Sequence, residues 1–469
     1  MKIRVFLLVV MICSSSLTLA GSPMYQITKS NLLSQFCLSA YLSVLEKPYL
    51  SSKILFSSYS NYVGSNGDGA CQLYILDVDS TGIIQLTNHV TQGIVDLSLA
   101  VPYGASISSD GSTILYERIA FPGLHVMDSD GENLVRLFDD YEGKYSSKAI
   151  SPDGNRIYFS PDEDMYFEGT SVSSVNRHLY SVGSDGSGLT KILTISEDDF
   201  VSIKVSPSGE YLGFITSANL FGSSSGKNKM FIINSDGSEL RQISQEIHGE
   251  VSAFSFSRID TLAYWSEAGI YAGNIDGTNI DLIYSGSFVR GSLSMSGNGK
   301  LLAASLSIFD TSISKIMSGM YIIDVESRSI LQEIGFQEAF GVNQLLSPTQ
   351  LSDDGNDFYF LSNIDLTGNN PENHWELFVS ALNGVAPITP SQLPISDVEA
   401  SDVSPESENS DSPAVENTEA PADSTGSSPK ASSGGGAFGP YVALGVFSLC
   451  LFRLYSFCSI KMTNRIDSA

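Results

Sequence analysis

One pattern recurs along most of the chain and limits what it can fold into. In residues 106–138, the pair Asp110-Gly111 precedes a short run of alternating apolar residues, and the pair Asp130-Gly131 precedes another. Variants of this stretch follow one another at a spacing of roughly 40–57 residues, which is typical of propeller blades with loops of variable length. The alternation within each run has the period of a strand and not that of a helix.

The Asp-Gly pairs are interpreted as turns. Glycine supplies the positive φ that tight hairpins need, and aspartate hydrogen-bonds to nearby backbone. The turn residues predicted to have this structural role are Asp110, Gly111, Asp130, Gly131, Asp153, Gly154, Asp236, Gly237, Asp276, Gly277, Asp354 and Gly355. Residues 128–131 and 77–79 also resemble short calcium loops, but the further oxygen ligands and distal Glu of an EF-hand are missing. Hairpin turns are the favoured interpretation.

Four short strands per repeat predict an all-β fold, a β-propeller of four-stranded antiparallel blades. Blades stacked around an axis bury one another's faces and leave only short edges. The repeats predict seven blades, with six as the alternative. The first repeat, from Lys53, has no leading strand of its own, so ring closure should supply one from the far end or from residues 24–50. A last short strand is expected near residues 387–389.

The third repeat carries the most specific resemblance. Ser151-Pro152-Asp153-Gly154-Asn155-Arg156-Ile157-Tyr158-Phe159, followed by Leu-Tyr and another Asp-Gly, resembles the TolB-type, WD-like propeller repeat. The resemblance covers residues 53–389. It implies a propeller, but it implies no particular activity, because this propeller serves unrelated roles.

The two ends of the chain predict a membrane protein. Lys2 and Arg4, an apolar run and small residues before position 20 have the order of a signal peptide. A second apolar run, broken by Arg453, is long enough to cross a bilayer, and the basic residues after it place the C-terminus in the cytoplasm. We therefore expect a single-pass type I protein with its propeller extracellular or lumenal. A GPI anchor is the alternative, because small residues at 432–436 precede the apolar tail.

The predicted organisation has six parts. They are a signal peptide (1–20), an N-terminal segment that could close the ring (21–50), the propeller (51–390), a disordered acidic Ser/Pro-rich stalk (391–436), a transmembrane helix (437–460) and a short cytoplasmic tail (461–469). Of the five cysteines, only Cys37 and Cys71 fall in the exported part. They could pair in an oxidising compartment, or they could remain two buried thiols.

The net charge and the motifs limit the classes of function that fit this sequence. The net charge is −27, from 25 basic and 52 acidic residues, which disfavours nucleic-acid binding. The histidines His89, His125, His178, His248 and His374 have no metal-ligand spacing, and no cofactor or metal is predicted. Residues 222–226 match G-x-S-x-G literally, but they lie in a loop without the strand-turn-helix context of a nucleophile elbow. With no hydrolase domain in view, we expect a protein that is not an enzyme.

The favoured function is a binding module for a protein or glycan partner, anchored in the lipid bilayer. Long loops between second and third strands should emerge on one face, at residues 61–69, 161–176, 218–229, 308–318 and 363–374. These loops are the best candidates for a binding surface, although insertions without a ligand would look the same. The alternatives are an enzyme with its site in the central channel and a scaffold without a ligand of its own.

Overall fold

The computed structural model describes fourteen stretches of the chain: residues 22–29, 45–66, 70–79, 82–89, 102–118, 123–138, 145–161, 176–196, 200–222, 226–286, 290–310, 315–338, 345–372 and 374–384. The chain divides into two compact units, residues 1–401 and 402–469. All described residues belong to the first unit. The predicted signal peptide (1–20), stalk (391–436), transmembrane helix (437–460) and tail (461–469) lie outside them.

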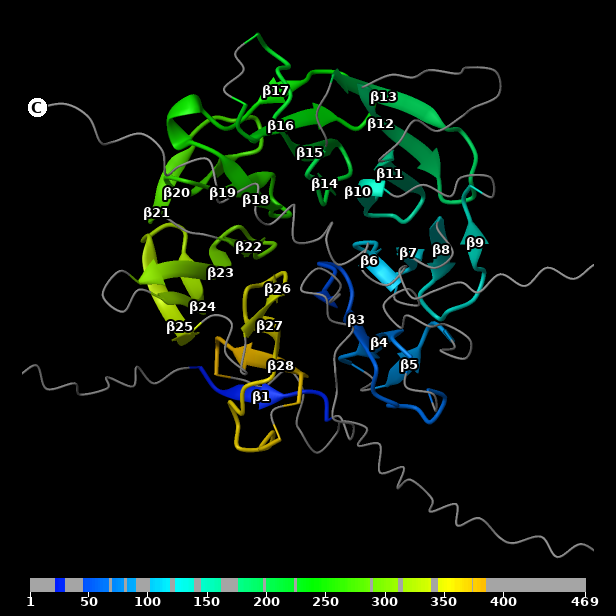
Figure 1. Ribbon diagram of the computed structural model, residues 1–469, viewed down its shortest axis with the longest axis vertical. Coiled ribbons are helices and arrows are strands. Elements are labelled where there is room, and N and C mark those ends of the chain that lie inside the picture. The colour runs from blue at the N-terminus through cyan, green and yellow to red at the C-terminus, as the bar shows by residue number, and fades with distance from the viewer. Residues whose placement is uncertain are drawn as a thin grey trace, which may run out of the picture. The chain divides into compact units, whose positions relative to one another are not determined.

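The first unit is an all-β propeller of seven four-stranded antiparallel blades, as the repeats predicted (Figure 1). The innermost strands of blades 1 to 7 are β2 (Leu45–Glu46), β6 (Pro102–Ile107), β10 (Tyr145–Ile150), β14 (Ser202–Val205), β18 (Val251–Phe256), β22 (Arg290–Met295) and β26 (Leu345–Leu351). The second strands are β3 (Lys53–Ser58), β7 (Thr113–Arg118), β11 (Arg156–Pro161), β15 (Tyr211–Thr216), β19 (Thr261–Ser266), β23 (Leu301–Asp310) and β27 (Asp357–Ser362).

The outer half of each blade is built in the same way. The third strands are β4 (Gln72–Asp77), β8 (Leu124–Asp128), β12 (Asn176–Gly183), β16 (Lys229–Asn234), β20 (Gly269–Asn274), β24 (Lys315–Asp324) and β28 (Glu376–Ala381). The outermost strands are β5 (Ile83–Gln85), β9 (Val135–Arg136), β13 (Thr190–Ser196), β17 (Arg241–Gln242), β21 (Asp281–Ser285), β25 (Ser329–Glu338) and, in blade 7, β1 (Met24–Gln26).

Two N-terminal strands complete the ring. β2 is the missing innermost strand of blade 1, where Leu45 pairs with Phe56. β1 takes the outermost position of blade 7, where Tyr25 pairs with Val379 of β28. The edge of blade 7 that a last strand near residues 387–389 was expected to cover is thus paired with β1. Residues 387–389 themselves lie outside the described stretches.

The core consists of seven apolar clusters, one between each pair of neighbouring blades. Strand β3 shows how one strand serves two of them. Ile54 and Phe56 pack in the cluster shared with blade 7, and Leu55 packs in the cluster shared with blade 2. Successive side chains of a strand point to opposite faces, so a blade buried on both faces needs apolar residues at consecutive positions. This explains the runs of apolar residues in the second and third strands.

Helical structure is scarce in the described part of the chain. It holds one short 3₁₀ helix, η2 (Glu246–His248), between blades 4 and 5. Within the same stretches, no helix is both long and apolar enough to span a bilayer.

Candidate functional site

The propeller has two distinct ends because the strands of each blade alternate in direction. The turns between first and second strands, and those between third and fourth strands, emerge at one end, called the turn face. The loops between second and third strands, and the connections between blades, emerge at the other end, called the loop face. All the predicted Asp-Gly turns belong to the turn face.

The Asp-Gly turns form compact hydrogen-bonded structures. In the inner turn of blade 3, Asp153 accepts hydrogen bonds from the Ser151 hydroxyl at 2.6 Å and from the Asn155 amide at 3.2 Å. The hydrogen bond from Ser151 lowers the pKa of the Asp153 carboxyl, against the effect of partial burial. The six turn glycines adopt the left-handed conformation, with φ between 71° and 90° (Gly111, Gly131, Gly154, Gly237, Gly277 and Gly355).

The other turn aspartates are held in the same way. Each accepts a hydrogen bond from the backbone amide two residues later (Asp110, Asp130, Asp236, Asp276 and Asp354). In the described part of the chain, no group of three or more His, Cys, Asp or Glu side chains could hold a metal ion. The geometry of the turns thus assigns these carboxylates a role in shaping the backbone.

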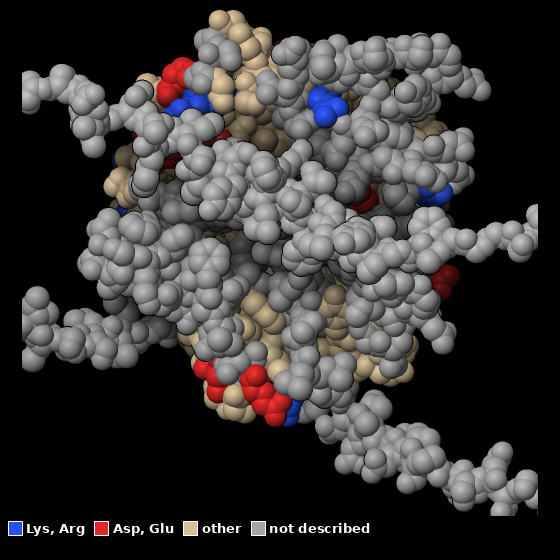
Figure 2. All heavy atoms as spheres, in the orientation of Figure 1, with Lys and Arg blue, Asp and Glu red and all other residues tan. Residues whose placement is uncertain are grey.

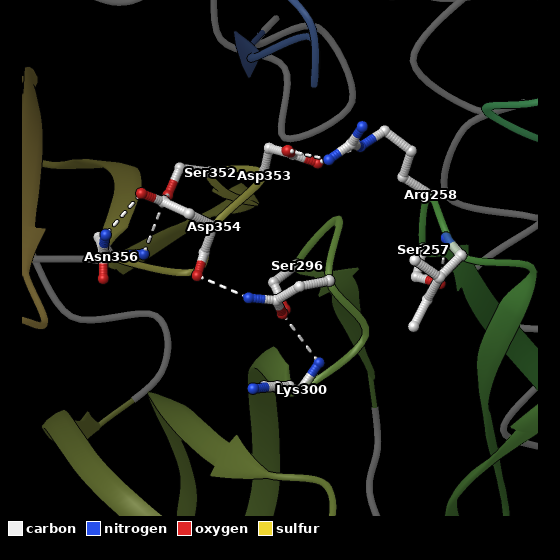
Figure 3. A network of polar contacts seen from close by, with 10 residues as sticks. Ser257, Arg258, Ser296, Lys300, Ser352, Asp353, Asp354 and Asn356 are labelled. Atoms are coloured by element: carbon white, nitrogen blue, oxygen red, sulfur yellow. Dashed lines mark hydrogen bonds and ion pairs between the residues drawn. The ribbon is translucent and has the colours of Figure 1, made fainter.

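Contacts between turns connect blades 5, 6 and 7 at the turn face (Figure 3). The guanidinium of Arg258 donates two hydrogen bonds to the carboxylate of Asp353, at 2.8 and 2.7 Å. Asn298, in the turn between them, donates through its backbone amide to the Asp353 carbonyl at 3.0 Å and through its side chain to the Asp354 carbonyl at 2.7 Å. Three successive inner turns are therefore joined into one polar network.

The segment after β2 crosses the same end of the ring. The Tyr49 hydroxyl lies 2.7 Å from the carbonyl of Phe256 and 2.9 Å from that of Met295, the last residues of β18 and β22. These carbonyls belong to blades 5 and 6, whereas Tyr49 follows the innermost strand of blade 1. The segment therefore spans the axis of the ring where the innermost strands end. Burial raises the pKa of the Tyr49 hydroxyl well above its usual value, which keeps it a neutral donor.

The axis of the ring holds two charged side chains of opposite sign, Glu46 on β2 and Lys204 on β14. Solvent reaches the axis, since Gly104, Lys204 and Ser252 are exposed although they lie on innermost strands. Enclosure by protein raises the pKa of Glu46 to about 7, and the charge of Lys204 partly offsets this. The side chain of Lys204 is exposed, so it loses its hydration only in part; this partial loss lowers its pKa, against the attraction of Glu46. The ammonium of Lys204 lies 5.6 Å from the centre of the Phe254 ring.

The sequence prediction singled out neither Glu46 nor Lys204. The available signal was a charged residue in the middle of a short innermost strand whose other residues are apolar or small, as in Ser-Ile-Lys-Val.

Two loops of the loop face have the same two hydrogen bonds at equivalent positions. The loops of blades 1 and 7 have equal length, between the paired residues Ser58 and Gln72 and the paired residues Ser362 and Glu376. In blade 1, Asn66 donates its backbone amide to the Asn61 side chain at 2.9 Å and its side-chain amide to the Ala70 carbonyl at 2.8 Å.

In blade 7, the same two hydrogen bonds recur. Asn370 donates to the Asp365 carboxylate at 3.0 Å and to the His374 carbonyl at 2.6 Å. The asparagine side chain thus fixes each loop from inside. These two neighbouring loops are pre-organised, which lowers the entropy lost when a partner binds.

Blades 4 and 5 present exposed apolar side chains at the loop face. Phe221, in the loop between β15 and β16, is 55% exposed, and Ile247, on η2, is 80% exposed. Ion pairs accompany them: Lys227 lies 2.6 Å from Glu267, and Lys229 lies 3.1 Å from Glu246. Figure 2 shows charged side chains of described residues, in red and blue, at several separate places on the surface in view. Exposed apolar side chains that are bordered by charged residues are typical of a protein-binding surface.

Of the five predicted loops, one differs from its predicted bounds and one lies mostly outside the described residues. The expectation of a loop at residues 308–318 is wrong at both of its ends, because β23 and β24 continue as a paired hairpin to Asp310 and Lys315. Most of the loop at residues 161–176 lies outside the described residues. Residues 223–225 of the G-x-S-x-G match lie outside them too.

The five histidines are distributed over different blades. His248 is buried, its Nδ1 lies 2.5 Å from the Tyr264 hydroxyl, and its ring stacks on Tyr271 with 3.9 Å between ring centres. Burial, with a smaller effect of the Lys229 charge, lowers the pKa of His248. His125 stacks on Tyr116, and His178 Nδ1 lies 2.9 Å from the Thr194 hydroxyl. These contacts describe packing within and between blades.

Cys71 is disulfide-bonded. It is the one cysteine among the described residues, so its partner lies outside them. The pairing of Cys71 with Cys37 stays a prediction.

Comparisons with known proteins support the fold alone. The sequence matches no family model, and the search by sequence finds no match among curated proteins. Among solved structures, oligogalacturonate lyase from Vibrio parahaemolyticus is similar with a TM-score of 0.50 and 13% identity, over 77% of this chain and 98% of the lyase. A prolyl endopeptidase is similar with a TM-score of 0.52 and 13% identity, over 74% of this chain and 50% of the peptidase. These neighbours are enzymes, and at this identity the likeness extends to the propeller and no further.

Proposed function

We propose that this chain is a TolB-type propeller that binds a protein partner through its loop face. One observation carries the proposal: Phe221 and Ile247 are exposed at the same end of the ring. Large apolar side chains exposed singly are common on protein surfaces. Here they emerge from a loop and a connection next to ion pairs, on a scaffold fixed by seven apolar clusters. A protein partner is favoured over a glycan because aromatic and aliphatic anchors are the residues that protein interfaces bury.

The experiment compares matched substitutions on the two faces. Phe221→Ser with Ile247→Ser alters the loop face. Leu134→Ser with Ile259→Ser alters side chains of the turn face that are 55% and 59% exposed. The full-length protein, fused to a proximity-labelling enzyme, labels its neighbours in cells. We expect a set of labelled proteins that the loop-face variant loses and the turn-face variant keeps.

Two results decide against the proposal. An unchanged set of labelled proteins in the loop-face variant would remove the loop face as the binding surface. Labelling that disappears after glycosidase treatment of the cells would replace the protein partner by a glycan. Equal melting temperatures of the two variants exclude misfolding as the cause of a difference.

We also propose that the propeller is held outside the cytoplasm by a membrane anchor at residues 437–460. The support is the sequence pattern: an apolar run follows an acidic stalk and precedes basic residues. Extraction of membranes at alkaline pH should leave the protein in the pellet, and an antibody against residues 461–469 should bind only after permeabilisation. Release by a phosphatidylinositol-specific phospholipase would establish the GPI alternative instead.

A further inference from the structure

We propose that the central channel binds a small zwitterion, with Lys204 contacting its carboxylate and Glu46 contacting its ammonium group. The site is independent of the loop face, so either proposal can fail alone. The positions of the two residues are the first observation. Glu46 is on the innermost strand of blade 1 and Lys204 is on that of blade 4, so the two side chains approach the axis from well-separated blades.

The second step is the lack of direct contacts. In the described part of the chain, neither the Glu46 carboxylate nor the Lys204 ammonium makes a hydrogen bond, and the two groups do not form an ion pair. The ammonium of Lys204 lies 5.6 Å from the centre of the Phe254 ring. By comparison, the ammonium of Lys148 lies 3.0 Å from the Glu117 carboxylate, with both side chains buried. This buried pair makes the close contact that the two channel charges lack.

The third observation concerns the hydration of the two charges. A charge enclosed by protein loses part of its hydration, and it is usually compensated by hydrogen bonds and a counter-charge. The pKa values of Glu46 and Lys204 are displaced in the directions that such a loss of hydration produces. Through-space attraction between the two groups compensates this only in part. Charged groups that lack close partners and that solvent can reach are candidates for ligand contacts.

The chemistry of the ligand follows from the two charges. Lys204 supplies up to three donors for a carboxylate, and Glu46 accepts from an ammonium. A ligand with both groups neutralises both side chains, whereas a simple carboxylate would leave Glu46 uncompensated. Exposed Gly104 and Ser252 add little bulk at the axis. Tyr49 spans the turn-face end, so the ligand would enter from the loop-face end.

The test uses the full-length protein in detergent and isothermal titration calorimetry. The probes are α-amino acids, each with two matched derivatives: the N-acetyl form lacks the cation, and the amide lacks the carboxylate. We expect at least one parent amino acid to bind, and both of its derivatives to bind at least tenfold more weakly. Lys204→Met and Glu46→Gln should each weaken the parent at least tenfold. Lys191→Met and Glu132→Gln, at exposed positions, should leave its affinity unchanged.

A stability measurement separates ligand binding from a structural role. Because each channel charge lacks a close partner, Lys204→Met and Glu46→Gln should melt at the same temperature as the parent or higher. A large loss of melting temperature in both would mean that the charges serve the fold, and would overturn the proposal. Absence of binding by every amino acid, or equal affinities of the parent and its N-acetyl form, would overturn it as well.

Discussion

The guanidinium of Arg258 and the carboxylate of Asp353 form a two-point ion pair between the inner turns of blades 5 and 7, with hydrogen bonds of 2.8 and 2.7 Å. The pair connects blade 5 to blade 7. The turn of blade 6 lies between them and contributes Asn298 to the same network (Figure 3). The arrangement ties three blades together at the turn face.

Breaking this pair should cost little, because the two side chains are 48% and 27% exposed. We expect a coupling energy of about 0.5 to 1 kcal/mol between Arg258→Ala and Asp353→Asn in a double-mutant cycle. Arg258→Lys should lose part of this energy, because lysine cannot make the two parallel hydrogen bonds. Denaturant unfolding of the four proteins measures the coupling. Additive effects of the two substitutions would contradict it.

The buried pair of Lys148 and Glu117 should behave differently. Its side chains are 6% and 5% exposed, and it joins blades 2 and 3. Glu117→Gln removes the counter-charge of a buried ammonium, so we expect a loss of about 3–5 kcal/mol. The double variant Glu117→Met with Lys148→Met should recover most of this loss.

The matched control is the exposed pair of Lys227 and Glu267, with side chains 44% and 55% exposed. There, Glu267→Gln should cost far less than Glu117→Gln, because solvent screens the exposed pair. Equal costs for the two Glu→Gln substitutions in thermal unfolding would show that burial of the Lys148–Glu117 pair has no consequence.

Asp357 should make the fold less stable as the pH rises. Burial, with the nearby charge of Asp354, raises the pKa of Asp357 from 3.8 to about 6, and Lys47 opposes this. A carboxyl with a raised folded-state pKa stabilises the fold below its unfolded pKa, and this contribution is lost as the pH rises through 6. Asp357→Asn should therefore raise the melting temperature at pH 7.5 and leave it nearly unchanged at pH 4.

The neighbouring Asp354 supplies a control of opposite sign. Hydrogen bonds from Asn356 and Ser352 outweigh partial burial and lower its pKa, so its contribution is present above the unfolded pKa and is lost as the pH falls. Asp354→Asn should therefore lower the melting temperature at pH 7.5. A stabilising effect of both substitutions would show that charge reduction alone explains the Asp357 result.

Thr28 should be needed for ring closure. Its hydroxyl donates to the Glu376 carboxylate at 2.5 Å and accepts from the Leu377 amide at 2.9 Å. Thr28→Val keeps the shape but removes both interactions at a buried position, so we expect a loss of about 1–3 kcal/mol. Thr28→Ser retains the hydroxyl and should cost much less. Equal melting temperatures of the Val and Ser variants would exclude this role.

The local pattern was enough to predict the blades. The Asp-Gly pairs mark turns because only a few residues tolerate positive φ, and strand alternation is visible in residues close together in the chain. Counting repeats predicted seven blades with six as the alternative, and the structure has seven. By contrast, β1 and β2 are only three and two residues long and carry no repeat signature. Their positions depend on pairing with β28 and β3, and for β1 the partner strand lies at the far end of the propeller.

The sequence by itself determined a propeller of four-stranded blades, because each repeat encodes its own turns and apolar faces. Only the tertiary structure decided which residues meet at the axis. Glu46 and Tyr49 belong to blade 1 and Lys204 belongs to blade 4, and nothing in a repeat specifies what faces it across the ring. Ring closure sets those distances, so the burial that shifts their pKa values arises only when all seven blades are in place.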